Sequence, residues 1–283
     1  MNWIQSLFAG IIQGLTEFLP VSSSGHLVMY NELMGNYDPE KNLAFSVFLH
    51  LGSLVAVLLI FRKDVWMVFK EFFTAIFDIC RGKPNFKTPE RRLMLMLVIA
   101  TIPAFIMGGL IQMLGFTAVL DNIYVTGAML IVTALLMFAI HKISKRRTGG
   151  YEQANAPLGC AAFVGLMQAI AIAPGLSRSG STIFAGMTSG LNKEFAVRFS
   201  FLMSIPVILG AAVFDFLGLG EVSIFDFGAS TLIIGFVAAF ITGIIAIKLI
   251  RFLIKSNKFY IFGIYCLLAA AAAFSIGIFN IRI

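Results

Sequence analysis

A carboxylate and an amide lie four residues apart near the start of the chain, in a segment apolar enough to enter a membrane. Gln13 and Glu17 share one face of a predicted helix, because residues four apart are neighbours on the helix surface. Charged side chains inside a membrane are costly and usually line a site. These oxygen atoms suit Mg²⁺ or Ca²⁺, which prefer oxygen ligands and often also contact phosphates. The alternative is that Glu17 only forms a salt bridge with Arg178, which would neutralise two charges within the membrane.

Three consecutive serines and a histidine follow in the stretch PVSSSGHL. A hydroxyl nucleophile needs a base within hydrogen-bonding distance, and histidine is the commonest base. Ser23 and His26 are three residues apart at the predicted start of a helix, so their side chains can meet. We therefore predict Ser23 as a nucleophile with His26 as its base. Two alternatives stay open: His26 could itself attack phosphorus, and the serines could serve only as caps of the helix.

A second polar stretch, PGLSRSGST, interrupts the second half of the chain. Its proline and Gly175 break the preceding helix. Backbone N–H groups at the start of the next helix, with Arg178 beside them, then form a site for a phosphate-type anion. Arginine can bind two phosphate oxygens at once. Further hydroxyl groups are offered there by Ser177, Ser179, Ser181 and Thr182. The alternative is a simple turn whose Arg178 pairs with Glu17 or Asp215.

Other polar residues are assigned structural roles. His50 lies inside an apolar segment and is interpreted as a hydrogen-bonding residue between helices rather than a ligand. The three cysteines lie in different segments without the spacing of a metal site, so free thiols are expected.

The rest of the sequence is that of an integral membrane protein. Of its 283 residues, 59% are hydrophobic and only 12% are charged, and the mean hydropathy is +0.93, outside the usual range of soluble domains. Two apolar stretches are short, 2–19 and 158–173, and each leads into one of the two polar segments. Six others are long enough to cross a hydrocarbon core of about 30 Å: 43–61, 93–114, 123–141, 195–217, 229–250 and 259–281.

The net charge of +7 does not indicate a nucleic-acid partner, because the basic residues gather in three connections, 62–92, 142–147 and 251–258. The other connections carry mostly acids, namely Asp38, Glu40, Asp121, Glu221 and Asp226. Basic connections of membrane proteins face the cytoplasm and suit anionic lipid headgroups. We therefore expect membrane lipid as a partner and no nucleic acid.

The two halves of the chain resemble each other. Gly10, Gln13 and Gly25 recur at a constant offset as Gly165, Gln168 and Gly180. Each short apolar stretch, together with the segment after it, is expected to enter and leave the membrane on one side. Three full spans then remain in each half, and because three is odd, the two halves have opposite orientations. All three basic connections then lie on one face, whereas eight full spans would divide them between both faces.

The prediction is an all-α polytopic membrane protein with six transmembrane helices and two re-entrant helical hairpins. It forms a single membrane domain, residues 1–283, of inverted-topology repeats over about 1–145 and 155–283. The tips of the hairpins meet near the midplane, where irregular backbone is tolerated only inside protein or beside a wet cavity. Many transporters build their substrate sites in the same way, so the fold alone leaves transporter and enzyme open.

The stretches QGLTEFLPVSSSGHL and PGLSRSGST resemble the two signature motifs of the bacterial undecaprenyl-diphosphatase family, also known as the bacitracin-resistance protein family, and the resemblance covers essentially the whole chain. It implies a membrane hydrolase that converts undecaprenyl diphosphate to undecaprenyl phosphate and phosphate, which recycles the lipid carrier for peptidoglycan synthesis. It also implies a divalent cation, Mg²⁺ or Ca²⁺, and a bacterial inner membrane location with the active site toward the outer face. Bacitracin would compete for the substrate rather than bind the protein, and a homodimer is left open.

The resemblance also implies roles for individual residues. Ser23, His26 and Glu17 would be catalytic, and Glu17 with Gln13 would hold the metal. The diphosphate would be bound by Gly175, Ser177, Arg178, Ser179 and Thr182. Many members carry Glu where this chain has Gln13, which shifts metal binding toward Glu17. The alternative function is a polyprenyl-phosphate flippase that uses the same anion site, although mere binding needs neither a nucleophile nor a base.

Overall fold

The structure is a computed structural model that describes residues 2–35, 39–82, 85–114, 122–146, 149–218 and 228–282, without the side chains of 39–44, 112 and 214–218. Within these residues the chain is helical, apart from connections and one isolated bridge between Tyr151 and Leu191. The helices are α1 (Trp3–Phe18), α2 (Ser23–Leu33), α3 (Pro39–Ile60), α4 (Arg62–Cys80), α5 (Pro89–Met113), α7 (Ile123–Arg146), α8 (Leu158–Ile170), α9 (Arg178–Thr188), α10 (Lys193–Gly218), α11 (Ala229–Lys255) and α12 (Tyr260–Phe279).

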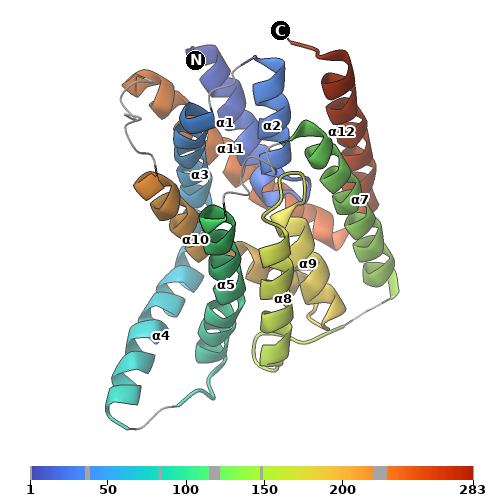
Figure 1. Cartoon of the computed structure of the whole chain (residues 1–283). Coiled ribbons are helices and arrows are strands. Elements are labelled where there is room, and N and C mark those ends of the chain that lie inside the picture. The colour runs from blue at the N-terminus through green and yellow to red at the C-terminus, as the bar shows by residue number, and fades with distance from the viewer. Residues whose placement is uncertain are drawn as a thin grey trace.

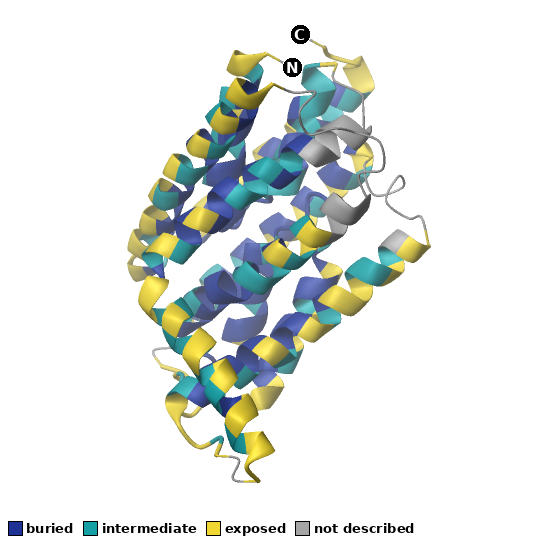
Figure 2. Cartoon of the chain, turned by 90° about the vertical axis from the view of Figure 1, so that its left-hand side faces the viewer, coloured by how far each residue is buried: buried dark blue, intermediate teal, exposed yellow. Residues whose placement is uncertain are grey.

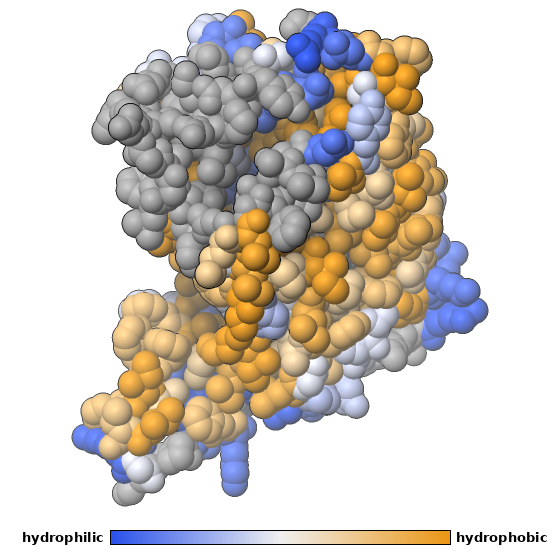
Figure 3. Space-filling view, viewed as in Figure 1, coloured by the Kyte–Doolittle hydropathy of each residue, from blue (hydrophilic) through white to orange (hydrophobic). Residues whose placement is uncertain are grey.

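Among the described residues, five helices are long and apolar enough to cross a membrane, namely α5, α7, α10, α11 and α12. The sixth predicted span corresponds to α3, whose segment Phe45–Ile60 is followed by α4 after a bend of 89°. Buried residues line the inside of the bundle and exposed ones its outer faces (Figure 2). Most of the coloured surface in Figure 3 is hydrophobic, with hydrophilic residues mainly toward its margins. The predicted all-α polytopic membrane protein is confirmed.

Helix α4 departs from the expectation of a plain basic connection over 62–92. Four of its exposed aromatic residues recur every three or four positions and so share one helix face: Trp66, Phe69, Phe73 and Phe77. On another side, Arg91 of α5 holds α4 by bonds to Glu71 (3.0 Å) and Asp78 (2.5 Å). The segment is therefore an amphipathic helix, and its many charges concealed that period in the sequence.

Two helical hairpins position the polar segments. Figure 1 shows α1 and α2 in the upper part of the molecule and α8 and α9 in the lower part, with their connections meeting between them. Helix α1 packs along α11, and α8 packs along α5. Gly10 permits the first contact, since a Cβ there would lie 2.4 Å from the carbonyl oxygen of Gly235. Gly165 permits the second, with the carbonyl oxygen of Ala100 at 2.5 Å. Each hairpin thus packs closely against a span from the other half of the chain.

The second helix of each hairpin begins in the same way. Ser22 caps α2 by accepting a hydrogen bond from the Gly25 N–H (3.3 Å), and Ser177 caps α9 by accepting one from the Gly180 N–H (3.1 Å). The two connections also touch, because a Cβ on Gly25 would lie 2.9 Å from the Cα of Gly175. Gly175 has φ +91°, a conformation that favours glycine. Two short, capped turns therefore meet backbone to backbone at the centre of the molecule.

The described parts of the basic connections lie together at one end of the bundle. The Arg92 side chain donates to the carbonyl oxygen of Ala156 (2.6 Å), which joins the start of α5 to the connection before α8. His141, near the end of α7, bonds to the carbonyl oxygen of Asn257 (2.7 Å), and Lys193 of α10 donates to the Asn257 side chain (2.8 Å). Of the predicted acidic residues, Asp38, Asp121, Glu221 and Asp226 lie outside the described residues, and the side chain of Glu40 is not described either.

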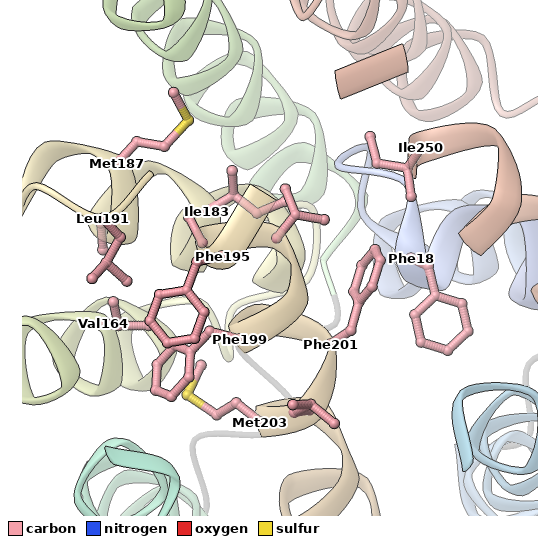
Figure 4. Packing of buried hydrophobic residues seen from close by; sticks show 14 of the residues in the cluster. Phe18, Val164, Ile183, Met187, Leu191, Phe195, Phe199, Phe201, Met203 and Ile250 are labelled. Carbon is pink, nitrogen blue, oxygen red and sulfur yellow. The ribbon is translucent and has the colours of Figure 1, made fainter. Parts of the chain in front are cut away.

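Buried aromatic rings connect the end of α1 to α10. Phe18 directly follows Glu17 in the chain, and its ring packs edge to face against Phe201 with the ring centroids 5.6 Å apart (Figure 4). Phe201 also meets Phe61, at the junction of α3 and α4, at 6.0 Å. These contacts fix the carboxylate-bearing end of α1 against the body of the bundle.

Candidate active site

An ion pair joins the two hairpins. The Arg178 guanidinium, on the first residue of α9, donates to Oε1 of Glu17, in the last turn of α1. The Glu17 side chain is 3% exposed and the Arg178 side chain 20%. Removing one partner of a buried pair leaves an uncompensated charge, so each holds the other in place. The guanidinium remains partly accessible, whereas the carboxylate does not.

The second carboxylate oxygen of Glu17 is surrounded by polar groups from three helices. Ser23 donates its hydroxyl proton to Oε2 at 2.6 Å, and the Gln13 amide donates to the same atom at 2.9 Å. Nε2 of His50 lies 3.9 Å from it. The structure therefore brings together Glu17, Gln13, Ser23 and Arg178, all four of which are predicted site residues.

His26 has different partners from those predicted. Its Nδ1 lies 2.7 Å from the Ser22 carbonyl oxygen, an acceptor, so Nδ1 carries the proton. The other nitrogen, Nε2, then accepts from the Tyr265 hydroxyl at 2.8 Å, and the two rings stack with centroids 5.6 Å apart. Ser23 donates to Glu17 rather than to His26, so this structure does not show the pairing of Ser23 with His26. Tyr265 lies on α12, far along the chain, and no spacing rule pointed to it.

The other residues of the PGLSRSGST stretch hold the loop itself. The Ser177 N–H donates to Thr133 (2.9 Å), whose hydroxyl donates to the carbonyl oxygen of Gly175 (2.8 Å). Ser179 donates to the carbonyl oxygen of Leu19 (3.1 Å). Thr182 bonds to Ser200 at 2.6 Å. Ser177, Ser179 and Thr182 are buried, and their bonds hold the backbone on both sides of Arg178. Their predicted contact with a diphosphate stays a prediction.

His50 is the site residue that the sequence analysis missed. It was expected to bond between helices, but its Nδ1 lies 2.8 Å from the carbonyl oxygen of Ser46 within its own helix, α3. That bond orients the ring so that Nε2, on its other edge, faces Oε2 of Glu17 at 3.9 Å. A histidine inside an apolar span is itself a signal of function, but only the fold shows which group it faces.

The oxygen atoms around Glu17 match part of a site for a hard divalent cation. The Glu17 carboxylate and the Ser23 hydroxyl are adjacent, and the Gln13 carbonyl oxygen is buried without a hydrogen-bond partner among the described residues. Such oxygen ligands suit Mg²⁺ or Ca²⁺. The part of the chain that the structure describes holds no group of three His, Cys, Asp or Glu side chains able to bind a metal. A bound ion would therefore need oxygens from the amide and from the substrate.

The family described as Bacitracin resistance protein BacA matches residues 6–272. The chain belongs to this family. It is 43% identical to the undecaprenyl-diphosphatase of Methanobrevibacter smithii, over 97% of each chain. It is 41% identical to the undecaprenyl-diphosphatase of Alkaliphilus metalliredigens, over 94% of this chain and 95% of the relative. It is 37% identical to that of Bacteroides thetaiotaomicron, over 96% of this chain and 98% of the relative. The family match spans both polar segments.

Proposed function

We propose that this chain is a membrane undecaprenyl-diphosphatase that hydrolyses undecaprenyl diphosphate to undecaprenyl phosphate and inorganic phosphate. The observation that carries the proposal is the Glu17–Arg178 ion pair. It joins a carboxylate that accepts a hydrogen bond from the Ser23 hydroxyl to a partly accessible guanidinium from the opposite hairpin. Family membership and the shared name of the relatives support the same activity. Phosphoryl transfer requires chiefly positioning and charge stabilisation, and these residues supply both.

Arg178 is proposed to bind the diphosphate. Its guanidinium lies at the N-terminus of α9, where the helix dipole also favours an anion. A diphosphate that enters the site offers Arg178 a stronger anionic partner than Glu17. The guanidinium then turns toward the phosphates and frees Oε1 of Glu17, while Ser177, Ser179 and Thr182 keep the loop in shape.

Ser23 is proposed to attack the terminal phosphorus. Its hydroxyl proton already points at Glu17 Oε2, so the proton passes to that carboxylate as the Ser23 oxygen–phosphorus bond forms. The bond between the terminal phosphorus and the bridging oxygen breaks, and undecaprenyl phosphate leaves. Water then attacks the phosphoserine and releases inorganic phosphate. The alternative nucleophile, His26, would first have to give up its bond to Tyr265.

Glu17, Gln13 and Ser23 would hold a divalent cation, which would neutralise phosphate charge when bound. The basic connections favour a cytoplasmic position for their face of the bundle. We therefore infer an inner membrane protein whose active site opens toward the outer side. The undecaprenyl chain would remain in the lipid, and bacitracin would compete by sequestering the substrate.

Phosphate release from undecaprenyl diphosphate tests this function directly. Purified wild-type protein with Mg²⁺ is compared with Ser23→Ala, His26→Ala and Arg178→Ala, and with Arg146→Ala, an exposed arginine at the end of α7, as the matched control. We expect release by wild type and the control, and loss in Arg178→Ala and Ser23→Ala. A wild type that binds the lipid but releases no phosphate would refute the proposal.

A further inference from the structure

A concave site lies at the end of the bundle that carries the basic connections. It is a pocket of about 500 Å³ formed where three helix ends meet: the junction of α3 and α4, the start of α10, and the end of α11. Its floor consists of buried apolar side chains, namely Phe61, Val197, Phe201 and Ile254. A pocket with an apolar floor at the end of membrane-spanning helices is suited to a molecule with both a polar head and an apolar chain.

The rim of this pocket has surplus positive charge. Arg198 is neutralised by Asp64, which accepts bonds of 3.0 Å and 2.6 Å from its guanidinium. Arg251 and Lys255 also line the pocket, one turn apart on α11, and neither has a carboxylate within ion-pair distance among the described residues. The acid on the rim, Glu194, lies 3.9 Å from Lys193. Two exposed cations are therefore available to an anion in the pocket.

The pocket is separate from the candidate active site. Phe201 forms part of its floor and packs edge to face on Phe18, the residue after Glu17, at 5.6 Å. Phe61 packs on the ring of Phe201 with the centroids 6.0 Å apart, and the Arg251 guanidinium lies 5.8 Å from the centroid of the Phe61 ring. Closely packed aromatic rings thus stand between the rim cations and the ion pair. A ligand in the pocket would touch neither Ser23 nor Arg178.

We propose that this pocket binds the phosphate group of an anionic membrane lipid, with Arg251 and Lys255 as its cationic partners. Arginine can bind two phosphate oxygens while lysine adds a point charge. Basic pockets between transmembrane helices on the cytoplasmic side are suited to lipid headgroups. Phe252, which lies on the rim and is 70% exposed, provides an apolar surface on which the lipid chains can continue from the pocket into the bilayer. This inference does not depend on the proposed hydrolysis.

Lipid binding to the purified full chain in detergent tests the proposal. Dioleoylphosphatidylglycerol is titrated and the bound lipid is counted by native mass spectrometry, with dioleoylphosphatidylcholine as the neutral lipid. The variant Arg251→Gln/Lys255→Gln removes both rim cations. The control Lys142→Gln/Lys145→Gln removes the same charge from exposed positions on α7 outside the pocket. A further titration adds inorganic phosphate as competitor, which separates a lipid site from a site for free phosphate.

We expect one saturable phosphatidylglycerol site in wild type and in the control, weakened at least about tenfold in the pocket variant, because each removed cation lowers the attraction to an anionic headgroup. Phosphatidylcholine should not saturate that site, and inorganic phosphate should not displace the lipid. Equal binding by the pocket variant would overturn the proposal, as would an equal loss in the control. Displacement by inorganic phosphate would also overturn it, since the site would then bind the free anion.

Discussion

The two hairpins share a backbone design but differ in their chemistry. Each has a serine cap, a glycine that allows the turns to touch, and a buried glutamine in its first helix. The first hairpin places Glu17 four residues after its glutamine, whereas the second has Ile172 at that position and instead places Arg178 at the start of its second helix. The repeated backbone thus brings two turns to one point, and the different side chains make that point a site. One half supplies the carboxylate and the hydroxyl, and the other supplies the cation.

The largest predicted effect concerns the cation of the second hairpin. Arg178→Ala should lower the rate of phosphate release about 10² to 10³-fold, the usual effect of removing one group that stabilises transition-state charge. Arg178→Lys should recover part of that rate, because lysine keeps the charge but loses the planar fork. Initial rates at saturating substrate measure both variants. A rate within twofold of wild type in Arg178→Ala would show that the second hairpin has no part in the chemistry.

The close packing of both hairpins can be tested by two alanines. Gly10→Ala and Gly165→Ala should each destabilise the fold by about 1–3 kcal/mol, since each new methyl group meets a carbonyl oxygen of a neighbouring span. Thermal unfolding in detergent measures the loss, with Gly159→Ala as control, because a Cβ there meets nothing within 4 Å. If only one of the two variants loses stability, the hairpins are not packed alike.

His50 belongs to the chemistry of the first hairpin alone, because it faces the Glu17 carboxylate and the second hairpin has no carboxylate at the matching position. His50→Gln should lower the rate about tenfold, as expected for a residue that positions a reacting group without touching the substrate. The binding of the substrate should change little. Separate determination of kcat and KM checks this, and an unchanged kcat would remove His50 from the site.

The smallest predicted effect is a difference between the two buried glutamines, Gln13 and Gln168, in what their replacement does to stability and activity. The Gln168 amide has no hydrogen-bond partner among the described residues, so Gln168→Leu should stabilise the protein by about 1 kcal/mol and leave activity unchanged. Gln13→Leu should instead lower activity, since it removes the bond to Glu17. Unfolding temperature and phosphate release are measured on both variants. A destabilised Gln168→Leu would contradict this difference between the halves.

The sequence predicts the spans and the two polar turns well because hydropathy and Pro-Gly-Ser composition are local properties. It offers the Glu17–Arg178 pair as one alternative, since both are charged residues in membrane segments that need partners. It does not predict α4, where charges interrupt an amphipathic pattern, or the contact between His26 and Tyr265, which depends on how α12 packs. The position of His50 beside Glu17 likewise depends on the rotation of α3, which an evenly apolar helix does not reveal.

A double-mutant cycle between the hairpins tests the central claim most directly. Phosphate release is measured for wild type, Glu17→Gln, Arg178→Lys and the double variant at saturating substrate. If the two residues act as one site, the double variant should be about as slow as the slower single variant, because the effects of groups that work as a unit are not additive. Losses that multiply independently would contradict the account, since the two hairpins would then contribute separately to the reaction.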